Sequence, residues 1–335
     1  MTVDRGRADG PDPIVSMLTG SLFTHVGYAL AVLGVADVLG DRTVHLSRVA
    51  ETTGAHPDPL LQLMRTGTGL GLFIEAPPRF FALTPAGQRM RTDHPHSRHT
   101  SFVRSVERNG PLLAELLHTV RTGLPAWEKV HGRPIFEETG ERYPLQLHDS
   151  PALIDLLTGY DLSGVRTVVD VAGGDGRVLD ALLRRHPDLR GVLFDLPAAV
   201  HRAREMVRPD AADRCEFVEG SFFDAVPGGG DLYLITRVLH NWNDNAVTAI
   251  LGAVRAAMPA DARLLVAERL AARPEREPMT LFLNMLMLLL NGGHERTEEE
   301  YRDLLERAGF AVADVRYPTA ATGTPAESLL EGVPK

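Results

Sequence analysis

The spacing of apolar residues changes once along the chain, and this change divides it into two parts. Up to about residue 160, apolar residues recur three or four positions apart, which predicts a series of short helices. Beyond residue 165, β-branched runs alternate with helical stretches at residues 178–185, 198–207, 245–257 and 298–308. The β-branched runs predict strands at residues 167–171, 191–195, 215–218, 232–235, 263–267, 312–317 and 328–333. Alternating strands and helices predict a doubly wound, Rossmann-like α/β domain with a parallel sheet.

The first hundred residues have the order of elements of a winged helix. Two short helical patterns, Leu46–Thr52 and Pro59–Thr66, precede a predicted hairpin around Pro77-Pro78. A winged helix can read DNA, but its groove-facing helix needs several Arg, Lys, Asn or Gln side chains. The second helix carries one cation, Arg65, so we favour packing or dimerisation over DNA binding. The weakly charged helix predicted at Ile14–Leu39 also favours a subunit interface, because it must be covered on most sides.

Composition and charge narrow the class of protein further. The 335 residues are 44% hydrophobic and 24% charged, as in an ordinary globular chain, and their number fits two domains. A formal net charge of -9 argues against broad attraction to nucleic acid or to an anionic membrane. The apolar stretch at 279–290 is too short to cross about 30 Å of hydrocarbon, and residues 1–13 lack the core of a secretory signal. The single cysteine, Cys215, cannot form an internal disulfide, so we expect a cytoplasmic protein.

A glycine cluster follows the first predicted strand of the α/β part and opens a helix. Ala172, Gly173 and Gly174 come at the end of this strand, where glycines let the backbone approach a ligand. The spacing does not fit a dinucleotide fingerprint, because the third glycine position falls on Leu179. A Walker loop is excluded as well, because no Gly-Lys-Ser or Gly-Lys-Thr follows. The loop therefore favours a cofactor without a pyrophosphate.

Polar side chains also follow the next two predicted strands. Asp195 ends the second strand, where a carboxylate can accept hydrogen bonds from both ribose hydroxyls of an adenosine. The alternative is that Asp195 only caps the following helix. Ser221 and Phe222 follow the third strand, where a polar group and an aromatic ring could flank an adenine. Together, the three strand ends predict a pocket for S-adenosylmethionine.

One histidine and two acids provide the candidate chemistry. His240 follows the fourth predicted strand, Glu268 ends the fifth, and Glu295 follows a Gly-Gly turn. Strand ends on this side border the cofactor site, so the three side chains are placed for proton transfer. The alternatives are a structural histidine, and acids that pair with Arg269 or Arg296 instead.

Several stretches resemble the caffeic-acid type O-methyltransferase family, in particular its bacterial members that tailor polyketide and other antibiotic aromatics. The resemblance covers nearly the whole chain, in the expected order. It includes the glycine loop and residues 83–87, 121–123, 160–164, 191–197, 220–224, 238–244 and 292–297. It implies a S-adenosylmethionine-dependent methyltransferase domain at 156–335 and a mostly α-helical, winged-helix dimerisation domain at 1–98. Connecting helices at 99–155 would contribute to the substrate pocket.

The resemblance also implies roles for individual residues. His240 matches the general base that removes the acceptor's hydroxyl proton, and Glu268 and Glu295 match the acids that flank its imidazole. The implied cofactor-binding residues are Asp170, Ala172, Gly173, Gly174, Asp195, Ser221, Phe222 and Arg237. The candidate acceptor-binding residues are Asn241, Met287 and Asn291. The implied partners are S-adenosylmethionine, a small aromatic acceptor and a second copy of the chain, with no metal.

The chain departs from the family pattern in three places. Asn241 and Asn243 replace the usual Asp residues, Ala172 replaces the first loop glycine, and the segment 136–160 is shorter than usual. These departures keep a second hypothesis open, an enzyme that binds the cofactor but catalyses hydroxylation or another non-methylating step. N- or C-methylation is a further variant, and a ligand-sensing winged-helix regulator is the non-enzymatic alternative. His294 could join His240 in a metal site, but no third ligand is evident in the sequence.

Overall fold

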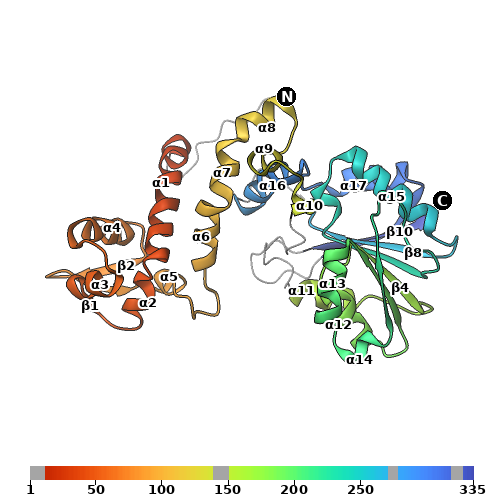
Figure 1. The fold of residues 1–335 in the computed structure, drawn as a ribbon, viewed down its shortest axis with the longest axis horizontal. Coiled ribbons are helices and arrows are strands. Elements are labelled where there is room, and N and C mark those ends of the chain that lie inside the picture. Colours follow the sequence, from red (N-terminus) through yellow and green to blue (C-terminus); the bar gives the residue numbers. More distant parts are fainter. Residues whose placement is uncertain (1–11, 139–150, 271–277, 318–326) are drawn as a thin grey trace. The chain divides into compact units, whose positions relative to one another are not determined.

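The computed structural model describes residues 12–138, 151–270, 278–317 and 327–335. They form two compact units, one that ends at Ala114 and one that begins at Glu115 (Figure 1). The first contains the elements predicted to form the winged helix, and the second contains the predicted α/β domain. Each unit has buried apolar clusters of its own, as expected for separate domains.

Helices and one small sheet make up the first unit. The predicted helix at residues 14–39 is interrupted at Gly34, which has a left-handed φ of 66° and separates two helices. The predicted hairpin is confirmed, and a third short strand joins it in the order β1-β3-β2. The strands are β1 (Val44–His45), β2 (Phe73–Ala76) and β3 (Phe80–Leu83). The helices are α1 (Pro13–Val32), α2 (Val35–Leu39), α3 (Leu46–Thr53), α4 (Pro57–Gly69), α5 (Pro85–Gln88), α6 (His99–Glu107) and α7 (Asn109–Ala114).

Helix α1 combines a tightly packed part with an exposed apolar part. A Cβ atom added at Gly27 would collide with the Phe102 ring of α6, so the glycine allows the two helices to approach. Nearer its start, α1 leaves large apolar side chains exposed, namely Ile14, Val15, Met17, Leu18 and Leu22. Among the described residues, α1 is the one helix long and apolar enough to cross a membrane by length and composition alone. Core helices of soluble proteins pass the same test.

A seven-stranded sheet forms the middle layer of the second unit. Its strands lie in the order β6-β5-β4-β7-β8-β10-β9. The strands from β6 to β8 are parallel, as predicted, whereas β10 runs antiparallel to both of its neighbours. Their bounds are β4 (Thr167–Val171), β5 (Arg190–Asp195), β6 (Cys215–Glu219), β7 (Leu232–Thr236), β8 (Arg263–Glu268), β9 (Phe310–Arg316) and β10 (Ser328–Pro334).

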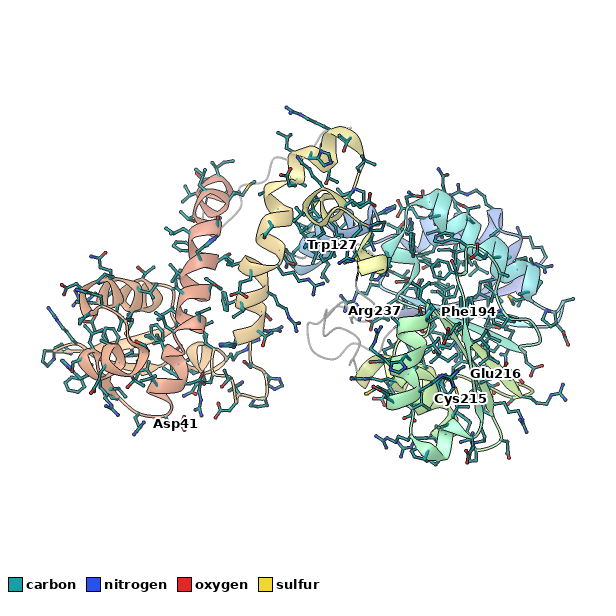
Figure 2. All side chains as sticks on the ribbon, viewed as in Figure 1. Asp41, Trp127, Phe194, Cys215, Glu216 and Arg237 are labelled. Atoms are coloured by element: carbon teal, nitrogen blue, oxygen red, sulfur yellow. The ribbon has the colours of Figure 1, made fainter. Side chains whose placement is uncertain are left out.

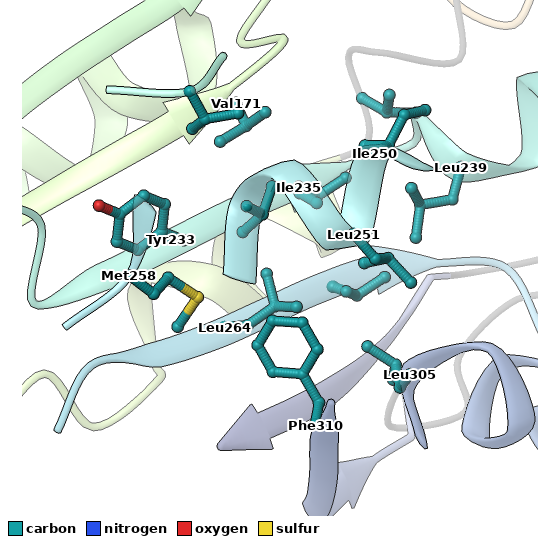
Figure 3. Close-up of a cluster of buried hydrophobic side chains, with 14 of the residues drawn as sticks. Val171, Tyr233, Ile235, Leu239, Ile250, Leu251, Met258, Leu264, Leu305 and Phe310 are labelled. Carbon is teal, nitrogen blue, oxygen red and sulfur yellow. The ribbon is translucent and has the colours of Figure 1, made fainter. Parts of the chain in front are cut away.

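Helices cover both faces of this sheet because successive strand residues point to opposite faces and both sets are apolar. In β4, Val169 and Val171 belong to one core cluster and Val168 to the other. The first cluster lies under α15 (Asp244–Ala257) and α17 (Glu298–Arg307); Figure 3 shows Leu239 among its side chains. The second lies under α11 (Pro151–Thr158), α12 (Arg177–Arg185), α13 (Pro197–Met206) and α14 (Pro209–Ala212).

A further group of helices in this unit surrounds α16 (Pro278–Asn291). This helix corresponds to the apolar stretch at 279–290 and ends at Asn291, directly before Gly292 and Gly293. It contacts α8 (Leu116–Thr122), α9 (Ala126–His131) and η2 (Leu239–Asn241), a turn of 3₁₀-helix. The short helix α10 (Ile135–Glu138) follows α9. Of the shortened segment at 136–160, residues 139–150 lie outside the described residues.

Candidate active site

The predicted site residues gather where the parallel strands of the second unit end. Parallel strands end at the same edge of a sheet, and β6, β5, β4, β7 and β8 are all paired in parallel. Asp170 lies near the end of β4, Asp195 ends β5 and Glu268 ends β8. The predicted cofactor-binding and catalytic residues are therefore brought to one edge.

The loop after β4 adopts a conformation that favours glycine. Gly174 and Gly176 have φ values of 62° and 77°, in the left-handed region where a Cβ is unfavourable. Ala172 adopts a φ of 58° although it is not a glycine, and its N–H donates to the carbonyl of Phe194 at 2.7 Å. The substitution noted in the sequence is thus tolerated without loss of the loop's shape.

Asp170 is buried directly beneath this loop. A Cβ added at Gly173 would lie 2.7 Å from Asp170 Oδ2, so any larger residue there would force the loop or the carboxylate to shift. Asp170 is 1% exposed, and neither of its oxygens has a hydrogen-bond partner within the described residues. Burial, followed by the charges of Asp195 and Asp175, raises the pKa of Asp170 to about 7. A buried carboxylate without donors fits a ligand that supplies a cation or hydrogen-bond donors, as S-adenosylmethionine does.

Asp195 holds the other side of the loop. Its Oδ2 accepts a hydrogen bond from the N–H of Gly174 at 2.8 Å, and its Oδ1 accepts one from Leu196 at 2.6 Å. The following helix α13 has no side-chain cap, so Asp195 does not have the capping role considered as an alternative. Burial raises the pKa of Asp195 above the ordinary value for an aspartate. A carboxylate oxygen can accept more than one hydrogen bond, so capacity for a ribose hydroxyl remains.

Aromatic rings from three segments meet beyond the end of β6. The ring of Trp242 lies edge-on to Phe222 and Phe223, at centroid distances of 5.8 and 5.0 Å. Phe136 of α10 stacks on the same indole at 5.3 Å. Ser221 accepts a hydrogen bond from the N–H of Phe223 at 3.2 Å. The predicted Ser221–Phe222 pair is therefore part of an apolar, aromatic surface of the kind that binds a flat ring.

Arg237 belongs to a buried group of charges after β7. It is 4% exposed, has a left-handed φ of 55°, and places Nη1 3.6 Å from Glu327 Oε1. Arg269 Nη2 lies 3.3 Å from the same oxygen, so one carboxylate faces two guanidinium groups. Burial and then the charge of Arg269 lower the pKa of Arg237. In Figure 2, Arg237, which follows the end of β7, lies away from Cys215 and Glu216, the first two residues of β6.

His240 and the two predicted acids form a buried triad. The triad residues come from η2, the end of β8 and the segment after α16, and all three are buried. His240 Nδ1 lies 3.0 Å from Glu295 Oε1 and 3.9 Å from Glu268 Oε2. Glu268 Oε1 accepts the N–H of Leu239 at 2.7 Å, which ties the turn to the sheet. Nδ1 is the ring nitrogen that faces both acids, so Nε2 is the one we expect to be available to a ligand.

The three groups of the triad shift one another's protonation. Burial alone would lower the pKa of His240, but the charge of Glu268 and the hydrogen bond and charge of Glu295 outweigh it and raise that pKa. Burial raises the pKa of Glu268. Burial also acts to raise the pKa of Glu295, but the hydrogen bond and charge of His240 lower it below the ordinary value. Glu295 is thus the ionised partner that orients the imidazole.

The candidate acceptor residues have different surroundings. Asn241 donates from Nδ2 to the carbonyl of Arg237 at 3.2 Å, which stabilises the turn. Met287 is 2% exposed on α16, and Asn291 Oδ1 at the end of that helix is buried with no hydrogen-bond partner within the described residues. Asn243 caps α15 by accepting the N–H of Ala246, a role that Asp fills equally well.

The structure adds two residues that the sequence did not single out for the site. Arg296, considered only as an alternative partner of Glu295, instead forms an ion pair with Asp244 at 2.7 Å. Glu327 neutralises Arg237 and Arg269, and no local pattern indicated its burial. The capping box of Thr297 and Glu300 marks the start of α17 in the sequence, but it gives no sign of the partners of Arg296. Among the described residues, no group of three or more His, Cys, Asp or Glu could hold a metal.

Comparison with known proteins places this geometry in a family. The sequence model of one protein family, the O-methyltransferase domain, matches residues 113–311. A phenazine O-methyltransferase of Lysobacter antibioticus is 34% identical over 92% of this chain and 93% of its own. The structure of an O-methyltransferase from neocarzinostatin biosynthesis, in complex with S-adenosylmethionine and 2-hydroxy-5-methyl naphthoic acid, superposes with a TM-score of 0.79. Its sequence is 29% identical, and the match covers 97% of this chain and 100% of its own.

The comparisons also bear on the non-methylating alternative. A weaker match, 32% identical over 90% of this chain and 85% of its own, is the aclacinomycin 10-hydroxylase of Streptomyces purpurascens. The fold alone therefore does not fix the reaction, but the stronger matches are methyltransferases. The family model, the shared length and the strand-end site agree with the resemblance stated from the sequence. The chain belongs to the O-methyltransferase family, and it is a S-adenosylmethionine-dependent enzyme of the bacterial branch that tailors secondary metabolites.

Proposed function

We propose that this enzyme methylates a phenolic or similarly acidic hydroxyl of a small aromatic secondary metabolite, with His240 as the general base. The observation that carries the proposal is the buried imidazole, whose Nδ1 is held 3.0 Å from Glu295 Oε1. If Nδ1 carries the proton and donates it to Glu295, Nε2 has a free lone pair. A phenol has an ordinary pKa near 10, so an imidazole with a raised pKa is a better match for its proton.

S-adenosylmethionine supplies an electrophilic methyl group on a sulfonium sulfur. The protein has to hold the acceptor oxygen in line with that group and remove its proton. Positioning of this kind contributes about 7–11 kcal/mol to lowering a barrier, and a general base contributes about 10²–10⁴-fold in rate. His240 accepts the proton, and the fixed carboxylate of Glu295 stabilises the imidazolium that results.

The residues proposed to hold S-adenosylmethionine surround the glycine loop. Asp195 would accept hydrogen bonds from the ribose hydroxyls, and Ser221 and Phe222 would flank the adenine. The backbone of the loop and the buried Asp170 carboxylate would contact the remainder. Support for this assignment comes from the two oxygens of Asp170 that lack partners in the described structure. The full proposed set is Asp170, Ala172, Gly173, Gly174, Asp195, Ser221, Phe222 and Arg237.

Helix α16 is proposed to line the acceptor site. It contacts η2, the turn that carries His240, and its buried side chains include Met287. A methionine adapts to flat apolar rings, and the amide oxygen of Asn291 could accept a hydrogen bond from a substituent. Asn241 would border the same site next to the base.

The proposed reaction is tested with cofactor that carries a labelled methyl group. Purified enzyme is incubated with labelled S-adenosylmethionine and a panel of hydroxylated and aminated phenazines, benzoates and naphthoates. We expect label in an aromatic methyl ether and release of S-adenosylhomocysteine. Product that lacks the label but has gained a hydroxyl group would identify the non-methylating reaction instead, and label on nitrogen or carbon would correct the acceptor class.

We further propose that the protein is a cytoplasmic homodimer that pairs through its first unit. The exposed apolar side chains at the start of α1 support this proposal, because monomers seldom expose such a stretch. The same burial in a subunit interface accounts for the apolar character of α1 without a membrane. We also propose that residues 1–98 form the dimerisation domain, that residues 99–155 contribute to the substrate pocket, and that residues 156–335 bind the cofactor.

A further inference from the structure

A short segment, Gly293–Thr297, packs against the turn that carries His240, and we call it the brace. A Cβ added at Gly293 would collide with the backbone carbonyl groups of His240 and Asn241, so only glycine allows the brace to lie this close. Glu295 of the brace contacts His240 Nδ1. The brace therefore contacts both the backbone of the turn and the His240 side chain.

Arg296 of the brace holds the turn from both ends. Its Nη1 donates to the carbonyl of Leu239 at 3.1 Å, and its Nη2 donates to the carbonyl of Trp242 at 2.7 Å. Its Nε and Nη2 donate to Asp244 Oδ1 at 3.0 and 2.7 Å. These three acceptors bracket His240 in the chain, and the guanidinium is completely buried. A planar fork with several fixed donors can serve such a set, whereas an ammonium cannot.

The brace itself is fixed by three separate elements. The N–H of Glu295 donates to Asn284 Oδ1 of α16 at 2.9 Å. The backbone of Arg296 forms an isolated β-bridge with Leu270, just beyond β8. Thr297 begins α17 with a capping box. The guanidinium is therefore attached to a rigid support, so movement of the turn relative to α16, β8 and α17 would break its hydrogen bonds.

We propose that Arg296 is a positioning residue for methyl transfer, which fixes the turn so that the His240 imidazole stays aligned with Glu295 and with the acceptor. The inference rests on the proposed role of His240 as general base. Arg296 touches neither acceptor nor cofactor in this account and acts only through His240. Because a displacement of about 1 Å at a reacting group can cost about 100-fold in rate, a loosened turn reduces catalysis without loss of the fold.

Kinetics of Arg296→Lys test the proposal. We expect kcat to fall by about 10- to 100-fold while the affinity for S-adenosylhomocysteine is unchanged. In a His240→Gln background, the same substitution should cause no further loss, because the residue it positions is absent. Arg302→Lys is the matched control, since Arg302 pairs with Glu298 on the surface of α17 and should leave both measurements unaltered. Equal losses in both backgrounds would show a general structural role and overturn the proposal.

A second pair of variants tests the close approach of the brace. Gly293→Ala should push the brace away from the turn and lower kcat, whereas Gly252→Ala is the control, because a Cβ there meets nothing within 4 Å. If Arg296→Lys does not fold, kcat of Gly293→Ala and of Asp244→Asn is compared in the native and His240→Gln backgrounds instead. Native kcat in Gly293→Ala and Asp244→Asn would contradict the proposal.

A measurement without substrate separates this inference from the proposed reaction. The ring nitrogens of His240, assigned through His240→Gln, are titrated by nuclear magnetic resonance in protein free of cofactor. In Arg296→Lys, the pKa of His240 should move back toward the ordinary value for histidine, because the imidazole is no longer held beside its two acids. An unchanged titration would overturn the positioning role, whereas a failed methyl-transfer assay of the native enzyme would overturn only the proposed function.

Discussion

His240 combines two opposing effects that together set its chemistry. Burial disfavours the charged imidazolium, but two carboxylates at 3.0 and 3.9 Å favour it more, so the pKa is raised. The two acids differ, because the pKa of Glu295 is lowered while burial raises that of Glu268. Glu295 is therefore the charged orienting group, and Glu268 mainly anchors the turn through the N–H of Leu239.

The pH dependence of Glu295→Gln follows from this division. A general base works when neutral, so kcat/KM of the native enzyme should rise with pH through an apparent pKa above the ordinary histidine value of about 6.5. Glutamine removes the charge that favours the imidazolium, so the rise should move to lower pH. We expect kcat to fall roughly 10- to 100-fold, because the orienting carboxylate is lost.

Profiles of kcat/KM against pH for the two proteins check this prediction. Glu298→Gln is the control, since that acid pairs with Arg302 away from the triad. A rise that moves to higher pH in Glu295→Gln, or does not move, would show that Glu295 does not set the protonation of the base.

The glycine loop and the brace both depend on a close approach that only glycine permits. In the loop, Gly173 passes over the Asp170 carboxylate, and in the brace, Gly293 lies against the turn of His240. Each glycine lets a loop pack directly against a residue of the proposed site, Asp170 in the first case and His240 in the second. In our proposals, the first loop would bind the cofactor and the second would position the base.

Gly173→Ala should weaken cofactor binding. A Cβ at this position would lie 2.7 Å from Asp170 Oδ2, so the loop or the buried carboxylate has to shift. Overpacking of this kind costs about 1–3 kcal/mol, which corresponds to an affinity loss of about 5- to 150-fold if the whole cost falls on the bound state. Calorimetric titration with S-adenosylhomocysteine measures the loss, with Gly252→Ala as a control that should bind normally. Native affinity in Gly173→Ala would place the cofactor elsewhere.

Much of the second unit was predictable because its signals are local. The buried strands are β-branched runs, and β4 has the predicted bounds Thr167–Val171. The antiparallel insertion of β10 between β8 and β9 was not predictable, because it depends on pairing across the chain. The break of the first helix at Gly34 was missed, because a single glycine inside an apolar helical pattern is often tolerated.

The site was predictable in part for the same reason. Asp170, Asp195 and Glu268 follow strand ends, and strand ends in a parallel sheet share an edge. The contact between Glu295 and His240 came from resemblance, since no local pattern joins residues so distant in the chain. The partners of Arg296 and Glu327 could not be read from the sequence, because a charged residue gives no sign of its burial or of its distant counterpart.

The whole molecule distributes its roles over two units. Every residue named above for the proposed site lies in the second unit. The first unit has its own core and an exposed apolar stretch on α1, which its own elements leave uncovered. A net charge of -9 agrees with small-molecule rather than nucleic-acid partners. Assembly is thus expected to depend on α1, and chemistry on the second unit.

The paired substitution Met17→Glu and Leu18→Glu should dissociate the proposed dimer. Both side chains are largely exposed on α1, so the substitutions should not disturb the core of the first unit. Analytical ultracentrifugation should show native protein at the dimer mass and the variant at the monomer mass, with unchanged circular dichroism. Native protein that sediments as a monomer, or that floats with lipid vesicles, would contradict assembly through α1.

The most direct test of His240 as the general base compares methyl transfer by native enzyme and His240→Ala in single-turnover experiments with labelled S-adenosylmethionine and a phenolic acceptor. We expect the variant to fold, to bind S-adenosylhomocysteine as tightly as the native enzyme, and to transfer the methyl group about 10²–10⁴-fold more slowly. Transfer at the native rate by a folded, cofactor-bound His240→Ala protein would contradict the assignment of His240 as the general base.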